Sequence, residues 1–179
     1  MTKRSTTHAT FVIERDFKAA PAKVFDAFAN PQSKAKWFGG PEDWDKSNNT
    51  FDLRVGGKVR LEFDNSRLPN EKPLPAKYKE AGKGQFEGVI TRLEPNRLLT
   101  HTWPWKSEQS EVTYELTPRG KQVLLTIVHR RLSKELVSKV MGGWDVHSGI
   151  LEDILNGVEP RPFWATHDKL EPEYAPLAA

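Results

Sequence analysis

The chain has 179 residues, 37% hydrophobic and 28% charged, a balance typical of one globular domain rather than a disordered or fibrous protein. It contains no cysteine, which excludes disulfides, thiolate metal sites and cysteine nucleophiles. Lys and Arg (27) exceed Asp and Glu (24) only slightly, and the two signs interleave along the chain, so we expect no nucleic-acid partner. The N-terminal residues carry no apolar run like that of a signal peptide, and no stretch is long enough to span a bilayer. We therefore expect a cytoplasmic protein without membrane insertion.

The N-terminal part of the sequence predicts one strand and then two short helices. Residues 11–17 have the composition of a strand. Pro21 suits the first turn of a helix that begins there, because its missing N–H would have no partner at that position. Asn30 and Pro31 end this helix and begin a second brief turn or helix through residue 36.

Residues 51–63 predict a β-hairpin. Apolar residues alternate with polar ones through 51–55 and again through 59–63, which is the period of a half-buried strand. Gly56 and Gly57 accept positive φ without a steric penalty, so we expect them to form a two-residue turn between the strands. A hairpin of this kind indicates an antiparallel sheet with one covered face.

Residues 64–84 lose this periodicity and contain several prolines, which predicts a long insertion loop. Two interpretations stay open for the loop: a lid over a pocket, or a tolerated insertion. Strands resume at 85–93, 97–103, 111–117 and 121–131, and the hairpin-length turns between them predict a meander.

A long helix follows Ser133, with apolar residues at helical spacing up to about residue 158. Gly142 and Gly143 are expected to bend this helix or to divide it. Residues 159–179 are rich in proline and predict an irregular C-terminal extension.

These elements predict an α+β fold in one domain, residues 10–158. About seven antiparallel strands form a curved sheet, and the long C-terminal helix must cover it because nothing else can bury the apolar stripe of the helix. A curved sheet that grips a helix tends to leave a cavity between the two.

Catalytic and metal-binding motifs are absent from the sequence. There is no Gly-x-Ser-x-Gly, His-Glu-x-x-His or P-loop pattern, and the five histidines lie far apart without ligand spacing, so we expect neither a metal nor a cofactor. His101 and His129 fall on strand faces that can point into the cavity. Two interpretations stay open for them: structural histidines with satisfied rings, or groups that contact a ligand or carry a proton.

Several segments together resemble the START-like superfamily and, within it, the family of homologues of the activator of the heat shock protein 90 ATPase. The resemblance spans roughly residues 10–158. Its segments are Ala20 to Phe28, the corner Trp37-Phe38-Gly39-Gly40-Pro41, Phe51 to Gly57, Gly88 to Trp103, Leu125 to His129, and Gly143-Trp144.

The resemblance implies a helix-grip fold, in which a curved antiparallel sheet wraps around a long C-terminal helix and leaves an apolar cavity. Its functional implication is broad, because the superfamily includes lipid carriers, hormone receptors, polyketide cyclases and aromatases, while the activator itself is a chaperone partner.

Our leading hypothesis is a binding protein for a hydrophobic or aromatic small molecule, held between the sheet and the helix. One alternative is a chaperone-associated ATPase regulator, with a heat-shock chaperone as partner. The other is a cyclase-like or hydrolase-like enzyme that uses His101 or His129 as acid or base. The residues expected to line the cavity are Phe51, Leu61, Leu99, His101, Trp103, Tyr114, Ile127, His129, Met141, Trp144 and Ser148.

Overall fold

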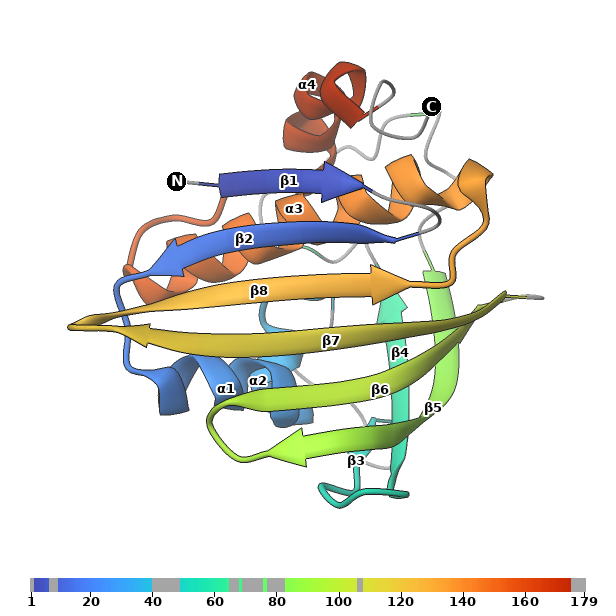
Figure 1. The fold of residues 1–179 in the computed structure, drawn as a ribbon. Helices are drawn as coiled ribbons and strands as arrows, with labels where there is room; N and C mark the ends of the chain where they lie inside the picture. Colours follow the sequence, from blue (N-terminus) through green and yellow to red (C-terminus); the bar gives the residue numbers. More distant parts are fainter. Residues whose placement is uncertain are drawn as a thin grey trace.

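The structure, a computed structural model, describes residues 2–6, 10–39, 49–64, 68, 76, 83–105 and 108–174. These residues form an eight-stranded antiparallel sheet and four helices (Figure 1). The elements are β1 (Thr2–Thr6), β2 (Phe11–Phe17), α1 (Pro21–Ala29), α2 (Pro31–Ala35), β3 (Thr50–Phe51), β4 (Lys58–Asp64), β5 (Lys83–Glu94), β6 (Leu98–Trp105), β7 (Glu108–Arg119), β8 (Gln122–Arg130), α3 (Lys134–Leu155) and α4 (Phe163–Tyr174).

The strands follow one another in space as β1-β2-β8-β7-β6-β5-β4-β3. The register between β5 and β6 shifts between Ile90 and Arg92, and such a bulge bends a strand. Figure 1 shows β4 and the upper part of β5 running across the direction of β7 and β8, so that the sheet curves around the layer that holds α1, α2 and α3. The predicted helix-grip fold is confirmed.

The core lies between the inner face of this sheet and α3. Every second residue of β2 is buried, and the alternation that buries Phe11, Ile13 and Phe17 also buries Arg15. On α3 the buried side includes Met141, and each large apolar side chain removed from water contributes about 1.5–3 kcal/mol.

Both short helices form where the sequence predicts them. Pro21 occupies the first turn of α1. The Asn30 side chain caps α2 by accepting hydrogen bonds from the backbone N–H groups of Gln32 and Ser33, at 2.9 and 3.3 Å. One asparagine thus ends α1 and begins α2, which fixes the corner between the helices.

The prediction of a two-residue turn at Gly56 and Gly57 is wrong. β3 ends at Phe51, and the chain from residue 52 to residue 57 forms a longer connection to β4. The backbone of Gly56 and Gly57 exchanges hydrogen bonds with that of Ile90 on β5, at 2.8 and 2.9 Å. A Cβ on Gly57 would lie 1.9 Å from the carbonyl oxygen of residue 52, so only glycine allows the connection to fold back on itself. Leu53 and Val55, which the alternation assigns to a half-buried strand, are exposed in this connection.

The C-terminal region also differs from expectation. α3 is one helix, so Gly142 and Gly143 do not divide it. A Cβ on Gly142 would lie 2.7 Å from the ring of Tyr174, and this glycine therefore lets α4 pack closely on α3. The extension is not irregular, because Phe163–Tyr174 forms α4.

β1 pairs with β2 at the edge of the sheet, and the sequence did not predict this strand.

The predicted insertion loop at 64–84 lies almost entirely outside the described residues. Among the helices that the structure describes, none combines the length and the apolar composition that crossing a membrane requires.

Candidate functional site

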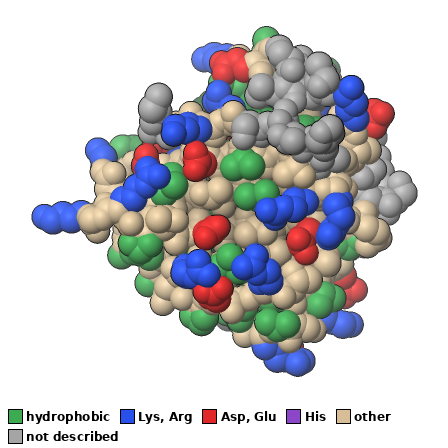
Figure 2. Space-filling view, viewed as in Figure 1, with side chains coloured by type: hydrophobic (Ala, Val, Ile, Leu, Met, Phe, Trp, Pro, Cys, Tyr) green, Lys and Arg blue, Asp and Glu red, His purple; other side chains and the backbone are tan. Residues whose placement is uncertain are grey.

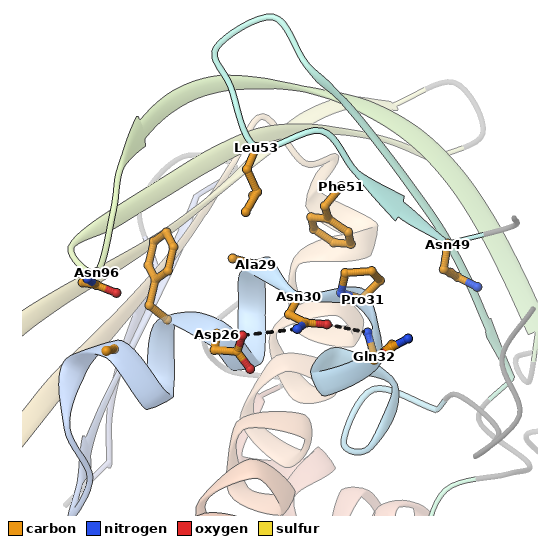
Figure 3. A pocket seen from close by; sticks show the side chains of 11 residues that line it. Asp26, Ala29, Asn30, Pro31, Gln32, Asn49, Phe51, Leu53 and Asn96 are labelled. Carbon is orange, nitrogen blue, oxygen red and sulfur yellow. Dashed lines mark hydrogen bonds between the residues drawn. The ribbon is translucent and has the colours of Figure 1, made fainter. Parts of the chain in front are cut away.

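A cleft of about 560 Å³ opens between the two short helices and the chain around β3 (Figure 3). Pockets that hold small molecules span about 300–1,000 Å³, so this cleft has room for a ligand of that kind. Its lining residues come from α1, from the corner between the two helices and the start of α2, from the β3 region and from the β5–β6 turn: Ala22, Phe25, Asp26, Ala29, Asn30, Pro31, Gln32, Asn49, Phe51, Leu53 and Asn96.

The wall of the cleft is apolar on two sides. Phe25 lies on α1, while Phe51 and Leu53 approach from the opposite side, with side chains directed toward the helices (Figure 3). Leu53 is 46% exposed, although it is an aliphatic residue. An exposed apolar side chain in the wall of a cleft is a surface that a ligand can cover.

Polar groups gather on the helix side of the cleft. The Asn30 Nδ2 group donates to Asp26 Oδ1 at 3.3 Å, and the Ser33 hydroxyl donates to Asp26 Oδ2 at 2.5 Å. These bonds hold the single acidic side chain of the cleft lining against the α1–α2 corner. The cleft therefore pairs an apolar wall with a small, fixed polar rim.

Lys34 lies just behind this cleft, on α2, and its side chain is fully buried. Its Nζ is 3.3 Å from the hydroxyl of Tyr114. Burial lowers the pKa of Lys34 to about 7, because an ammonium group loses its hydration there. Six aromatic ring centroids lie 4.9–5.8 Å from Nζ, within the range of cation–π attraction: those of Phe28, Trp37, Phe38, Phe51, Tyr114 and Trp144.

Lys34 begins a chain of polar groups that continues into the sheet. The Tyr114 hydroxyl lies 3.4 Å from His101 Nε2, and His101 Nδ1 lies 2.9 Å from the carbonyl oxygen of Thr102. A carbonyl can only accept, so His101 carries its proton on Nδ1, and Nε2 accepts from the tyrosine. Burial first, and the nearby Lys34 second, lower the pKa of His101 to about 3. The imidazole is therefore neutral at physiological pH.

His129 has a partner on each ring nitrogen. The indole N–H of Trp144 donates to Nδ1 at 3.1 Å, and Nε2 lies 2.9 Å from the hydroxyl of Ser110. That hydroxyl donates to the carbonyl of Trp103 at 2.6 Å, so His129 Nε2 is the donor to Ser110. Burial lowers the pKa of His129 to about 3. Fixed partners on both nitrogens are typical of a structural histidine, and a proton-transfer role for this residue stays a prediction without support from its contacts.

On the other side of α3, a second set of buried charges is fully paired. The Arg15 guanidinium donates to Asp145 Oδ1 at 2.7 Å, to Glu152 Oε2 at 2.5 Å and to the Ser148 hydroxyl at 3.2 Å. Arg4 also forms an ion pair with Asp145. Ser148 belongs to this network and donates to the Asp145 carbonyl at 3.0 Å.

Of the residues predicted to line a cavity, Phe51 lies in the wall of the cleft, and the others do not line it. The structure brings His101, Trp103, Tyr114, His129 and Trp144 together in one buried aromatic cluster, with Phe86 stacked on Trp103 at 4.0 Å. Leu61, Leu99, Ile127 and Met141 are fully buried in the same core. Ligand contact by these interior residues stays a prediction.

Sequence reasoning missed Phe25, Leu53 and Lys34. The alternation through residues 51–55 assigns Leu53 to a half-buried strand, and the prediction of the first helix gives Phe25 no role at a site. Nothing in the sequence separates Lys34 from its neighbour Lys36, which is exposed.

One group of side chains on α4 has the composition of a metal site. Ligand atoms of His167, Asp168 and Glu171 lie within 4.8 Å of one another. Both carboxylates are exposed, and exposed acidic groups on a helix commonly lie together without a metal. We therefore assign no metal to them.

The outer face of the sheet carries both signs of charge. Figure 2 shows Lys and Arg side chains interspersed with Asp and Glu over the face seen in Figure 1. Exposed ion pairs such as Arg97 with Glu94 and Arg119 with Asp16 belong to this kind of surface, where water screens the attraction between the charges. The described part of this face thus has no patch of a single sign.

Comparisons with known proteins agree with the helix-grip fold. A family model described as "Activator of Hsp90 ATPase homolog 1-like protein" matches residues 18–156. The chain is similar to the solved structure of the protein encoded by gene BPP1335 from Bordetella parapertussis, with 28% identity and a TM-score of 0.76 over 94% of this chain and 86% of that one.

Two further solved structures share the fold. CalU16 from Micromonospora echinospora is 24% identical, with a TM-score of 0.67 over 99% of this chain and 96% of that one. Protein CV1439 from Chromobacterium violaceum is also 24% identical, with a TM-score of 0.63 over 86% of this chain and 99% of that one. No curated protein matches the chain.

Proposed function

The chain belongs to the activator of Hsp90 ATPase homolog 1-like family, and we propose that it binds a hydrophobic or aromatic small molecule in the cleft between α1, α2 and β3. The observation that carries the proposal is the cleft itself, with Phe25, Phe51 and Leu53 as its apolar wall. An apolar lining with few polar groups is the usual composition of a ligand pocket.

The core behind the cleft is filled by side chains, which favours binding in the open cleft over binding inside the core. The aromatic cluster around Trp103 and Trp144 is closely packed, with ring centroids 5.3 Å apart in that pair. The polar groups of the cluster are hydrogen-bonded to one another, as in the contact between Trp144 and His129. The open cleft offers a ligand apolar surface without displacing these contacts.

A titration with the uncharged fluorescent probe N-phenyl-1-naphthylamine tests the proposal. We expect saturable binding, and we expect Leu53→Asp to weaken it about tenfold, because a carboxylate would have to lose water against the apolar probe. Val55→Asp is the matched control, since Val55 is 63% exposed in the same connection but does not line the cleft. A wild-type protein that fails to bind the probe, or two variants with equal effects, would contradict the proposal.

A chaperone-associated ATPase regulator is the second candidate, and the family match is the observation that favours it. On this hypothesis the protein acts through its surface and stimulates ATP hydrolysis by the cognate chaperone. An ATPase assay with and without the protein, together with a pull-down, measures this. No stimulation combined with no association would remove the candidate.

A further inference from the structure

Lys34 is a buried lysine with no counter-charge among the residues that the structure describes. Among the described residues no Asp or Glu forms an ion pair with it, and its one side-chain hydrogen bond is to the Tyr114 hydroxyl. An ammonium group has three N–H donors, and the bond to Tyr114 uses one of them. A buried charge is costly unless it is paired and hydrogen-bonded, and aromatic faces compensate only part of that cost.

The position of Lys34 connects this unpaired charge with the cleft. Pro31 and Gln32, one turn earlier on α2, line the cleft. The Phe51 ring belongs to both sites, because it forms part of the cleft wall and its centroid lies 5.8 Å from Lys34 Nζ. Phe51 is half-buried at the end of a two-residue strand, and its ring lies between the cleft and the Lys34 side chain.

We propose that Lys34 is the counter-charge for the carboxylate of an apolar or aromatic ligand in the cleft, an inference that rests on the proposed function. The ring system of the ligand lies against Phe25 and Leu53. The Phe51 ring turns aside, and the carboxylate reaches Lys34 Nζ in its place. The ammonium then gains a charge-assisted hydrogen bond while it keeps its contact with Tyr114.

The charges around the cleft favour one orientation and one ligand charge. Asp26 at the rim repels a carboxylate, so the acidic end of the ligand points inward and its apolar part faces the mouth. A phosphate would bring a second negative charge. Among the described neighbours of Lys34, the only other titratable bases are His101 and His147, which burial keeps neutral by lowering the pKa of each to about 3. A single carboxylate therefore fits the single cation.

Protonation links binding to pH. The titratable groups that face Lys34 are Tyr114 on β7, His101 on β6 and His147 on α3. Burial raises the pKa of Tyr114 well above its usual value and lowers those of both histidines, so none of the three titrates between pH 7 and 9. A bound carboxylate favours the ammonium form of Lys34, and binding in this range takes up a proton.

A matched pair of ligands tests the inference: 2-naphthoate, which carries the carboxylate, and 2-naphthamide, which has nearly the same shape and no charge. Isothermal titration calorimetry at pH 7.5 should show about tenfold tighter binding of the naphthoate. Lys34→Met should remove this preference, so that the variant binds the two compounds with equal affinity. Lys36→Met should keep the preference, because Lys36 is an exposed lysine at the C-terminal cap of the same helix.

The outcomes separate the two proposals. If neither compound binds the wild-type protein, the proposed function is overturned. If both bind with equal affinity, or if Lys34→Met keeps the preference, the inference about Lys34 is overturned while the proposed function stands.

Titrations at pH 8 in buffers with different ionisation enthalpies give a second readout that needs no variant. Proton uptake on naphthoate binding supports the inference, and its absence contradicts it.

Discussion

Asp145 and Lys34 are both buried charged residues, yet their surroundings are opposite. Asp145 on α3 forms ion pairs with Arg15 and Arg4 and accepts a hydrogen bond from the Tyr174 hydroxyl at 3.1 Å. Lys34 on α2 contacts one neutral hydroxyl and a set of aromatic rings. Asp145 thus has charged partners of opposite sign, whereas Lys34 has none among the described residues.

The difference indicates different roles. The network around Asp145 joins β1, β2 and α4 to α3, so its charges stabilise the packing of elements that are far apart in the sequence. Lys34 forms no ion pair with another described element, and apolar packing alone would hold the elements around it together. A saturated buried network is structural, whereas an unsaturated buried charge beside a cleft has capacity for a ligand.

The largest effect should come from breaking the paired network. Asp145→Ala leaves the Arg15 guanidinium buried without its closest partner, and we expect the free energy of unfolding to fall by about 3–5 kcal/mol. Urea unfolding followed by circular dichroism measures this. Asp52→Ala is the control, because the ion pair of Asp52 with Arg54 is exposed, and its loss should cost at most about 1 kcal/mol. Equal losses in the two variants would contradict a structural role for Asp145.

Removing the unpaired amine of Lys34 should raise the free energy of unfolding rather than lower it. Lys34→Met replaces a desolvated amine by an apolar side chain of similar length, and we expect the free energy of unfolding at pH 7 to rise by about 2–3 kcal/mol. The same urea titration measures it. A less stable variant would mean that the aromatic rings stabilise the ammonium group by more than burial costs it.

The pH dependence of stability should distinguish the same two regions. The pKa of Lys34 is about 7 in the folded protein and 10.5 when the residue is exposed, so between these values the unfolded chain binds the proton that the folded chain has lost. Stability therefore rises with pH, by about 2 kcal/mol between pH 7 and 9. Lys34→Met should abolish this rise and Asp145→Ala should keep it. A rise that is equally steep in Lys34→Met would assign it to another group.

The smallest effect concerns the helix that covers the paired network. Gly142→Ala would place a Cβ 2.7 Å from the Tyr174 ring and 2.8 Å from His167 Nε2, and we expect a loss of about 1 kcal/mol. Gly143→Ala is the matched neighbour, because its Cβ meets nothing within 4 Å and alanine favours a helix by about 1 kcal/mol. Thermal unfolding of both variants should thus give shifts of opposite sign. Shifts of the same sign would contradict close packing of α4 at Gly142.

Much of the fold could be predicted because its signals are local. Pro21, Asn30 and Pro31 act on the backbone of their own turn, and both short helices begin where these residues are. The connection after Phe51 could not be predicted in the same way. Its alternating pattern suits a half-buried strand, but Gly56 and Gly57 bond to β5, a strand whose position depends on the whole sheet.

The candidate site was predicted less well than the fold. Phe51 was predicted to contact a ligand and lies in the cleft wall, whereas the predicted histidines and tryptophans of the interior contact one another. Strand alternation assigns a residue to the inner face of a sheet. It does not tell whether that face is open to a ligand or filled by the side chains of a neighbouring helix, because this depends on volumes contributed by distant segments.

The sequence by itself determined the order of most strands and helices, β1 and α4 excepted, and the inward face of strands such as β2, because apolar periodicity and Pro and Gly positions act over a few residues. Arg15 illustrates this, since alternation with Phe11, Ile13 and Phe17 places it on the buried face. Only the tertiary structure decided which buried charge is paired. Lys34 and Lys36 are alike in sequence, but two residues on a helix point about 200° apart, and the packing of α2 against the sheet buries the first and exposes the second.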